Sequence, residues 1–357
     1  MQPKTLSALS LSATTPAAIE PCKLRLKACL GQGAYATVRL AELLPPSGSY
    51  SSPRAVAVKT LHRQLHTAEE IELFVREGEL LCTLSNENIV TFIGCSWRPL
   101  VAEHPVAAST QAASAHRQAA GRGAGQALAA PQHPPAASIF YLQQYCAGGS
   151  IGELVRRQMV QPFKLLYSDA DALRWSLHIA GALQYLHESS PAIMHRDLKL
   201  DNVLLTSPDK SVANAKCRSS AGCELTGRTG SYGFMAPEVL QCRPYNASAD
   251  IFSLGMCMFN IFARRISGFD VLLSCPGAAD PLEVFAAKVA GGWRPPLPPL
   301  VPAAVAGVIQ ACWKGEPCLR ASAGAVVRML QGIEESGELA DSLPPAAQRG
   351  CVPCAVM

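Results

Sequence analysis

Residues 195–202 (His-Arg-Asp-Leu-Lys-Leu-Asp-Asn) gather the side-chain types that phosphoryl transfer needs. The carboxylate of Asp197 can accept the proton of an attacking hydroxyl. The ammonium group of Lys199 can neutralise charge on a moving phosphoryl group, and the amide oxygen of Asn202 is a ligand that Mg²⁺ accepts. The octet therefore predicts phosphoryl-transfer chemistry, provided that other elements deliver a nucleotide to it.

Two segments near the start of the chain could bind the phosphates of a nucleotide. Residues 30–38 read as a glycine loop, in which Gly31 and Gly33 lack the Cβ that would keep backbone amides away from phosphates. Residues 55–59 alternate in the manner of a β-strand and end at Lys59. A cationic side chain on that strand suits a phosphate ligand.

Two further segments indicate the elements around this strand. Residues 67–70 have the form of a capping box, and apolar residues then recur at helical spacing, which predicts a helix that includes Glu77. Residues 139–150 predict a buried strand that runs into a connector marked by two glycines.

In this order, the segments resemble the landmarks of the protein kinases. Residues 236–238 (Ala-Pro-Glu) and Arg320 match two more landmarks, and residues 230–235 and 293–298 are most similar to the tyrosine-kinase-like group, in particular its Raf-like serine/threonine kinases. The resemblance implies an α+β, bilobal protein-kinase-like fold. Its small N-lobe would hold an antiparallel sheet and one helix, and its larger C-lobe would be mainly helical.

The resemblance also implies a role for each matched residue. Asp197 would be the catalytic base and Asn202 a magnesium ligand. Lys199, two residues after the base, matches the serine/threonine-specific enzymes. Glu238 would form a structural ion pair with Arg320. The residues implied in ATP binding are Gly31, Gly33, Val38, Ala57, Lys59, Glu77, Gln144 and Cys146.

The roles of Glu77 and of the hinge residues follow from the same resemblance. Glu77 would pair with Lys59 and orient it, although it could equally be one of several solvated carboxylates on its helix. Adenine would bind backbone groups from Gln144 to Cys146, with Gln143 as the gatekeeper side chain. Cys146 itself is expected to be a small apolar filler.

One landmark of the family is absent. Kinases carry Asp-Phe-Gly roughly a dozen residues after the catalytic asparagine, and its aspartate binds magnesium. Residues 212–223 contain no carboxylate, Asp209 comes too early and Glu224 too late. Asn202 alone would hold Mg²⁺ poorly, because the ion prefers charged oxygen ligands. Either the chain is a pseudokinase, or a short segment was lost in deriving the sequence and the natural protein is an ordinary kinase.

The composition fits one folded domain with additions. Of the 357 residues 49% are hydrophobic, which excludes a largely disordered protein. The net charge of +4 is spread along the chain, so we expect no nucleic-acid partner. The predicted divisions are a disordered N-terminus at 1–22, a kinase domain at 23–333 (N-lobe 23–145 with a low-complexity insertion at 98–137, C-lobe 146–333) and a flexible tail at 334–357.

The cysteines and the last residues bear on location. Fourteen cysteines show no disulfide or zinc framework, which favours free thiols in the cytoplasm. No apolar run is long enough to span a membrane. Residues 354–357 form a C-a-a-X box, so Cys354 is a candidate prenylation site and Cys351 a candidate palmitoylation site for peripheral membrane association.

We therefore predict an ATP-dependent protein serine/threonine kinase that acts in signal transduction, with ATP and Mg²⁺ as cofactors and a protein as substrate. The alternative is a pseudokinase that binds nucleotide or acts as a scaffold, because the Asp-Phe-Gly magnesium ligand is missing.

Overall fold

The computed structural model describes residues 19, 23–32, 36–45, 51–62, 78–96, 140–218, 232–267 and 281–339. Contacts divide the chain into two compact units. Among the described residues, the sheet unit contains those from 19 to 62 together with 93–96 and 140–143, and the helical unit contains 78–92 and those from 144 onward. The predicted α+β architecture of a sheet-bearing part and a mainly helical part is confirmed.

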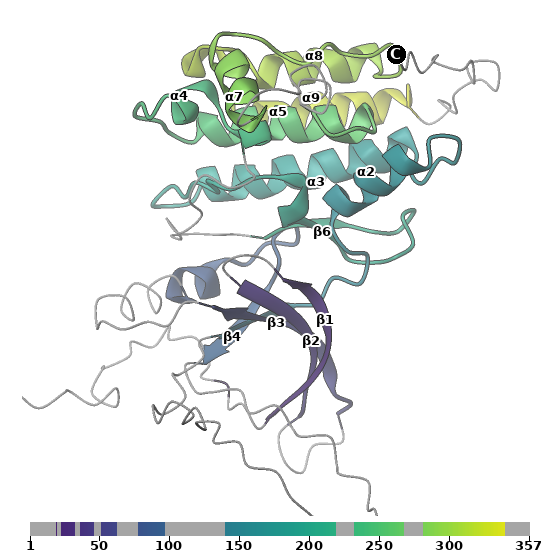
Figure 1. Cartoon of the computed structure of the whole chain (residues 1–357), viewed down its shortest axis with the longest axis vertical. Coiled ribbons are helices and arrows are strands. Elements are labelled where there is room, and N and C mark those ends of the chain that lie inside the picture. Colours follow the sequence, from purple (N-terminus) through teal and green to yellow (C-terminus); the bar gives the residue numbers. More distant parts are fainter. Residues whose placement is uncertain are drawn as a thin grey trace, which may run out of the picture. The chain divides into compact units, whose positions relative to one another are not determined.

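Five strands form the sheet: β1 (Leu24–Gln32), β2 (Ala36–Leu43), β3 (Arg54–Leu61), β4 (Phe92–Ser96) and β5 (Phe140–Gln144). Their spatial order is β1-β2-β3-β5-β4, and β1, β2 and β3 pair in antiparallel fashion. Figure 1 shows these three as long, strongly curved purple arrows. The strand predicted at residues 55–59 is therefore correct and lies at the centre of the sheet.

The period of two along β3 separates its faces. Val56 and Val58 are fully buried, and they join Ala41, Phe140 and Leu142 in the core of the sheet unit. Because successive strand residues point to opposite faces, Ala57 and Lys59 lie on the other face of the sheet.

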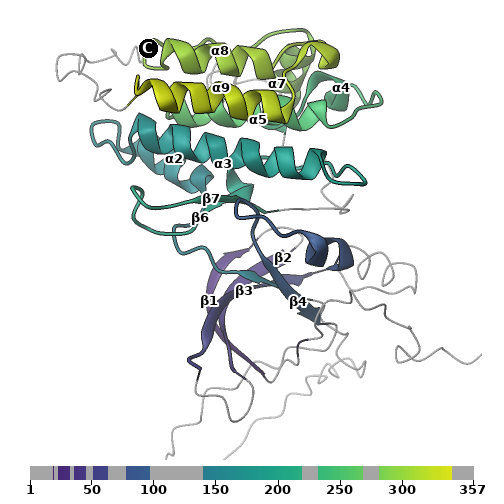
Figure 2. The ribbon, with the colours of Figure 1, turned by 180° about the vertical axis from the view of Figure 1, so that it is seen from behind.

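The helical unit contains α2 (Ile151–Val160), α3 (Asp169–His187), α4 (Pro237–Leu240), α5 (Ser248–Phe262), α7 (Pro281–Ala290), α8 (Ala303–Cys312) and α9 (Ala323–Ser336). In Figures 1 and 2 the long helices lie in successive layers, and α3 packs against both α5 and α9. The apolar run at 251–262 forms α5, whose side chains are almost all buried, as expected of a central core helix. None of the helices among the described residues is long and apolar enough to cross a membrane.

The end of the last helix differs slightly from the predicted division at residue 334. Helix α9 continues to Ser336, Gly337 closes it in the left-handed conformation (φ 68°), and Leu339 is buried. The insertion at 98–137 and residues 340–357 lie outside the described residues.

The glycine-marked connector after β5 requires its glycines. Gly149 has φ +71°, which side chains rarely adopt, and a Cβ on Gly148 would lie 2.2 Å from the carbonyl oxygen of Ser207. Gly148 N–H donates to Leu205 O at 2.9 Å, which ties the connector to the strand that follows the catalytic octet.

A small hairpin follows the octet and positions it. A 3₁₀ turn at Leu200–Asn202 leads into β6 (Val203–Leu205), which pairs with β7 (Ala215–Cys217) so that Val203 lies opposite Cys217. Asp209 lies in the intervening turn. Because β7 ends opposite the start of β6, the residue after β7 lies beside Asn202.

Candidate active site

Asp250, in the first turn of α5, anchors the backbone of the octet through hydrogen bonds. Its carboxylate accepts the backbone N–H groups of His195 at 2.8 Å and Arg196 at 2.9 Å, and lies 2.9 Å from His187 Nε2. Arg196 has φ 64°, a strained conformation for a side chain of this size. Asp250 therefore holds the loop backbone in a shape that it would not adopt by itself.

The charge state of Asp250 follows from the same contacts. Burial opposes ionisation of this carboxyl, but the hydrogen bond from His187, together with the charge and backbone N–H of His195, outweighs it and lowers the pKa of Asp250 below its ordinary value. The group is thus a carboxylate that accepts hydrogen bonds, as the two N–H donors require.

Within the octet, the three predicted catalytic side chains contact one another. Asn202 Nδ2 donates to both Asp197 O and Asp197 Oδ2 at 2.7 Å. Lys199 Nζ lies 3.0 Å from Asp197 Oδ1. Asn202 is buried, and the side chains of Lys199 and Asp197 are 19% and 14% exposed. The carboxylate of Asp197 is therefore held in a fixed orientation but remains reachable from solvent.

The place beside Asn202 is taken by Arg218. Its backbone N–H donates to Asn202 O at 2.8 Å, and its Nη2 donates to Asn202 Oδ1. Burial lowers the pKa of the Arg218 guanidinium, while the negative charges of Asp197 and Asp201 oppose that shift. Since arginine does not deprotonate in proteins, a permanent positive charge lies against the amide oxygen predicted to bind magnesium.

In the sheet unit, the strand register gathers the predicted phosphate-binding residues. Gly31 of β1 lies opposite Val38 of β2, which in turn lies opposite Lys59 of β3. Ala57 lies two residues before Lys59 and therefore shares its face. These residues form one continuous patch on the face that does not carry Val56 and Val58. Gly33 and Glu77 lie outside the described residues.

The predicted hinge runs from the end of β5. Gln144 N–H donates to Thr91 O at 2.9 Å, and the Gln144 side chain accepts from Thr91 Oγ1 at 3.2 Å. Of its backbone groups, Gln144 can thus offer an adenine base only its carbonyl. Burial, partly offset by the charge of Lys216, raises the pKa of the Cys146 thiol to about 11. Cys146 is 7% exposed, which fits a small apolar filler.

The predicted pair of Glu238 and Arg320 is present and buried. Arg320 Nη1 and Nη2 donate to the two carboxylate oxygens at 2.7 and 2.8 Å. Arg320 also donates to the carbonyls of Lys314, Ser248 and Gly315. Burial raises the pKa of Glu238, but the hydrogen bond from Arg320 outweighs it and lowers that pKa overall. The pair locks the segment before α5 onto the end of α8.

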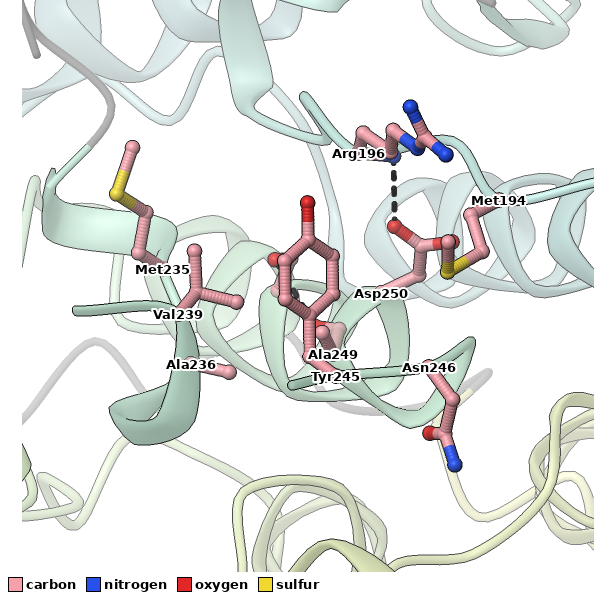
Figure 3. Close-up of a pocket in the computed structure, with 10 residues that line it drawn as sticks. Met194, Arg196, Met235, Ala236, Val239, Tyr245, Asn246, Ala249 and Asp250 are labelled. Atoms are coloured by element: carbon pink, nitrogen blue, oxygen red, sulfur yellow. Dashed lines mark hydrogen bonds between the residues drawn. The ribbon is translucent and has the colours of Figure 1, made fainter. Parts of the chain in front are cut away.

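A small pocket lies between the octet and this segment (Figure 3). Figure 3 marks the bond from Arg196 N–H to Asp250 at one side of it. The rest of the lining is mixed polar and apolar and comes from Met194, Met235, Ala236, Val239, Tyr245, Asn246, Ala249 and Ser253.

Comparison with known proteins agrees with this geometry. The family model described as the protein kinase domain matches residues 24–329. The chain belongs to the protein kinase family. Serine/threonine-protein kinase CTR1 of Arabidopsis thaliana is 28% identical over 323 residues, which cover 88% of this chain and 32% of CTR1. Serine/threonine/tyrosine-protein kinase HT1 of the same plant is 28% identical over 289 residues, 79% of this chain and 61% of HT1.

A third relative of the kinase domain is mitogen-activated protein kinase kinase kinase 7 of Homo sapiens, 29% identical over 197 residues, 54% of this chain and 30% of the relative. These relatives confirm the predicted resemblance to Raf-like kinases of the tyrosine-kinase-like group. The chain spans less than two thirds of the length of each of the three.

Protein kinases use ATP with a divalent metal, but the residues around Asn202 that the structure describes do not fit such an ion. Asn202 Oδ1 accepts from Arg218, and no cluster of three or more His, Cys, Asp or Glu side chains able to hold a metal is found among the described residues. Asp201, the nearest carboxylate along the chain, is held by Arg156 at 2.6 Å.

Two residues of this site were missed by the sequence reasoning. Asp250 directly precedes the apolar run at 251–262, and a carboxylate in that place is the one sequence signal of a buried acceptor. Arg218 was passed over as part of a segment without a carboxylate. Its place next to Asn202 follows from the register of the hairpin, in which Val203 lies opposite Cys217.

Proposed function

We propose that this kinase domain transfers the γ-phosphate of ATP to serine or threonine hydroxyls of a protein. The observation that carries the proposal is the hydrogen-bonded set of Asp197, Lys199 and Asn202, anchored through Asp250. The family match and the names of the relatives support the same activity.

The proposed reaction moves one proton and one phosphoryl group. Asp197 accepts the hydroxyl proton of the substrate while the hydroxyl oxygen forms a bond to the γ-phosphorus, and the bond from that phosphorus to the β-phosphate oxygen breaks to release ADP. Lys199 lies 3.0 Å from Asp197 Oδ1 and is placed to stabilise negative charge on the moving group. No step in this proposal is assigned to Mg²⁺.

Within the sheet unit, binding of the nucleotide is assigned to residues on one face of the sheet. The patch of Gly31, Val38, Ala57 and Lys59 supports contact with the phosphates and the base, since cross-strand neighbours present one face to a ligand. The hinge residues Gln144 and Cys146, and the undescribed Gly33 and Glu77, keep their predicted roles as proposals.

The pocket between the octet and residues 235–239 suits a substrate peptide. The apolar part of its mixed lining, which includes Met235, Val239 and the ring of the 45% exposed Tyr245, would accept an apolar side chain close to the acceptor hydroxyl. Cytoplasmic location remains a prediction. Lipid attachment at Cys351 and Cys354 also remains a prediction, because those two cysteines lie outside the described residues.

Transfer of radioactive phosphate from ATP to a mixture of serine, threonine and tyrosine peptides tests the proposal. The purified chain should label serine and threonine peptides, and Asp197→Asn should abolish the signal. Asp209→Asn removes the same charge from the exposed turn of the hairpin and should leave labelling unchanged. Equal labelling by the wild type and Asp197→Asn would reject the activity. Nucleotide binding without transfer would then remain, an outcome favoured by the contact of Arg218 with Asn202.

A further inference from the structure

The position of Arg218 is set by the backbone and not by chance packing of a long side chain. Residue 218 directly follows β7, and its N–H is bonded to the carbonyl of Asn202 at 2.8 Å. The preceding residue, Cys217, is held on both sides, because it donates to Asn88 O at 2.8 Å and accepts from Val90 N–H at 2.9 Å. The backbone of residue 218 is therefore fixed beside Asn202, whichever side chain it carries.

Position 218 lies in the segment where the family carries the aspartate that binds the metal. A family site with that aspartate and one divalent ion carries a net charge of plus one at this point. Arg218 without an ion carries the same charge. The guanidinium of Arg218 thus supplies positive charge beside Asn202, in the segment where the family has its metal.

The same side chain works against a metal. The carboxylate ligand is gone, Asn202 Oδ1 is engaged by Arg218 Nη2, and a guanidinium repels a dication at this distance. A guanidinium is, however, a strong ligand for phosphate oxygens, because its planar set of N–H donors matches two of them at once. Arg218 has five such donors, of which the bond to Asn202 uses Nη2.

We propose that Arg218 takes the place of the divalent metal, so that this kinase domain binds the polyphosphate of adenine nucleotides that carry no metal ion. The inference rests on the nucleotide-binding part of the proposed function and does not require phosphoryl transfer. The Asn202 amide then orients the guanidinium of Arg218 through Oδ1 and the Asp197 carboxylate through Nδ2.

Calorimetric titration of ATP into the full chain, in excess EDTA and in excess MgCl₂, tests the inference. The wild type should bind ATP in EDTA at least as tightly as in magnesium, because Mg²⁺ competes with Arg218 for the phosphates. In Arg218→Asp, affinity in EDTA should fall by about tenfold or more, the loss of one charge-assisted pair, and magnesium should restore binding.

Two further variants keep the test decisive. Arg218→Gln removes the charge without adding a carboxylate, so ATP should bind weakly in both buffers. Arg328→Asp, on the exposed face of α9, repeats the charge reversal away from the site and should behave as the wild type. Circular dichroism of each variant reports whether it has folded.

The wild-type titrations alone can overturn the inference, so it does not depend on the folding of a variant. Binding of ATP in magnesium but not in EDTA would reject a metal-free site while leaving the proposed kinase function intact. No binding of ATP in either buffer, by folded wild-type protein, would reject both.

Discussion

Removal of the Asp250 carboxylate should release the catalytic octet. In Asp250→Ala the backbone N–H groups of His195 and Arg196 lose their acceptor while His195 stays buried. A buried donor without a partner costs about 1–3 kcal/mol, which applies in full to the N–H of His195, whereas Arg196 is an exposed residue and its N–H adds less. Since domains are stable by only about 5–15 kcal/mol, the variant should lose a sizeable fraction of its stability.

Asp250→Asn should cost about half as much, because its amide oxygen can still accept from one of the two N–H groups while its NH₂ faces the other. The ionised carboxylate also links stability to pH. The folded pKa of Asp250 is lowered, so its contribution is present above the unfolded pKa and is lost as the pH falls through the folded pKa. In Asp250→Asn this part of the acid sensitivity should be absent.

Urea unfolding followed by circular dichroism measures the loss of stability, and amide hydrogen exchange read by mass spectrometry over residues 193–199 measures the loosening of the loop. Glu335→Ala, on an exposed part of α9, is the matched control. Equal unfolding midpoints for Asp250→Ala and Glu335→Ala, with unchanged exchange in the loop, would refute the anchoring role.

Two other predictions concern stability. Glu238→Gln and Arg320→Met should each cost about 3–5 kcal/mol in urea unfolding, because either change leaves a buried charge uncompensated, and the double variant should cost less than the two together; additive losses would show that the pair is not coupled. His178 Nδ1 accepts Ala215 N–H at 3.1 Å, and burial, helped by the charge of Arg174, lowers the pKa of His178. The free energy of unfolding should therefore fall as the pH drops below about 6.5, the unfolded pKa, towards the folded pKa, and thermal melts of His178→Gln should lack this part of the slope.

Much of the fold and the site was open to sequence reasoning because the signals are local. The alternation at residues 55–59, the glycines at 148 and 149 and the apolar run at 251–262 each reflect a conformation that the neighbouring residues impose. The order of the octet likewise predicts that Asp197, Lys199 and Asn202 meet, since they lie within six residues of one another.

What the sequence did not reveal depends on contacts between distant segments. Asp250 meets the octet across more than fifty residues, and His178 supports β7 from a helix that precedes it by 37 residues. Neither contact produces a periodic pattern in the sequence. A buried acceptor is satisfied by a single donor, which can lie at any distance along the chain. The strand pairing that brings Arg218 to Asn202 likewise becomes visible only once the register of the hairpin is known.

The contact between Arg218 and Asn202 ties nucleotide binding to the state of the catalytic base. Asn202 bonds Arg218 through its oxygen and Asp197 through its nitrogen, so one amide orients both the proposed phosphate ligand and the proposed base. A metal ion can leave with the product, whereas Arg218 remains attached to the chain. The losses of ATP affinity in Arg218→Gln and Asn202→Ala should therefore be far from additive. Either change alone already breaks the contact between the guanidinium and the amide that orients it.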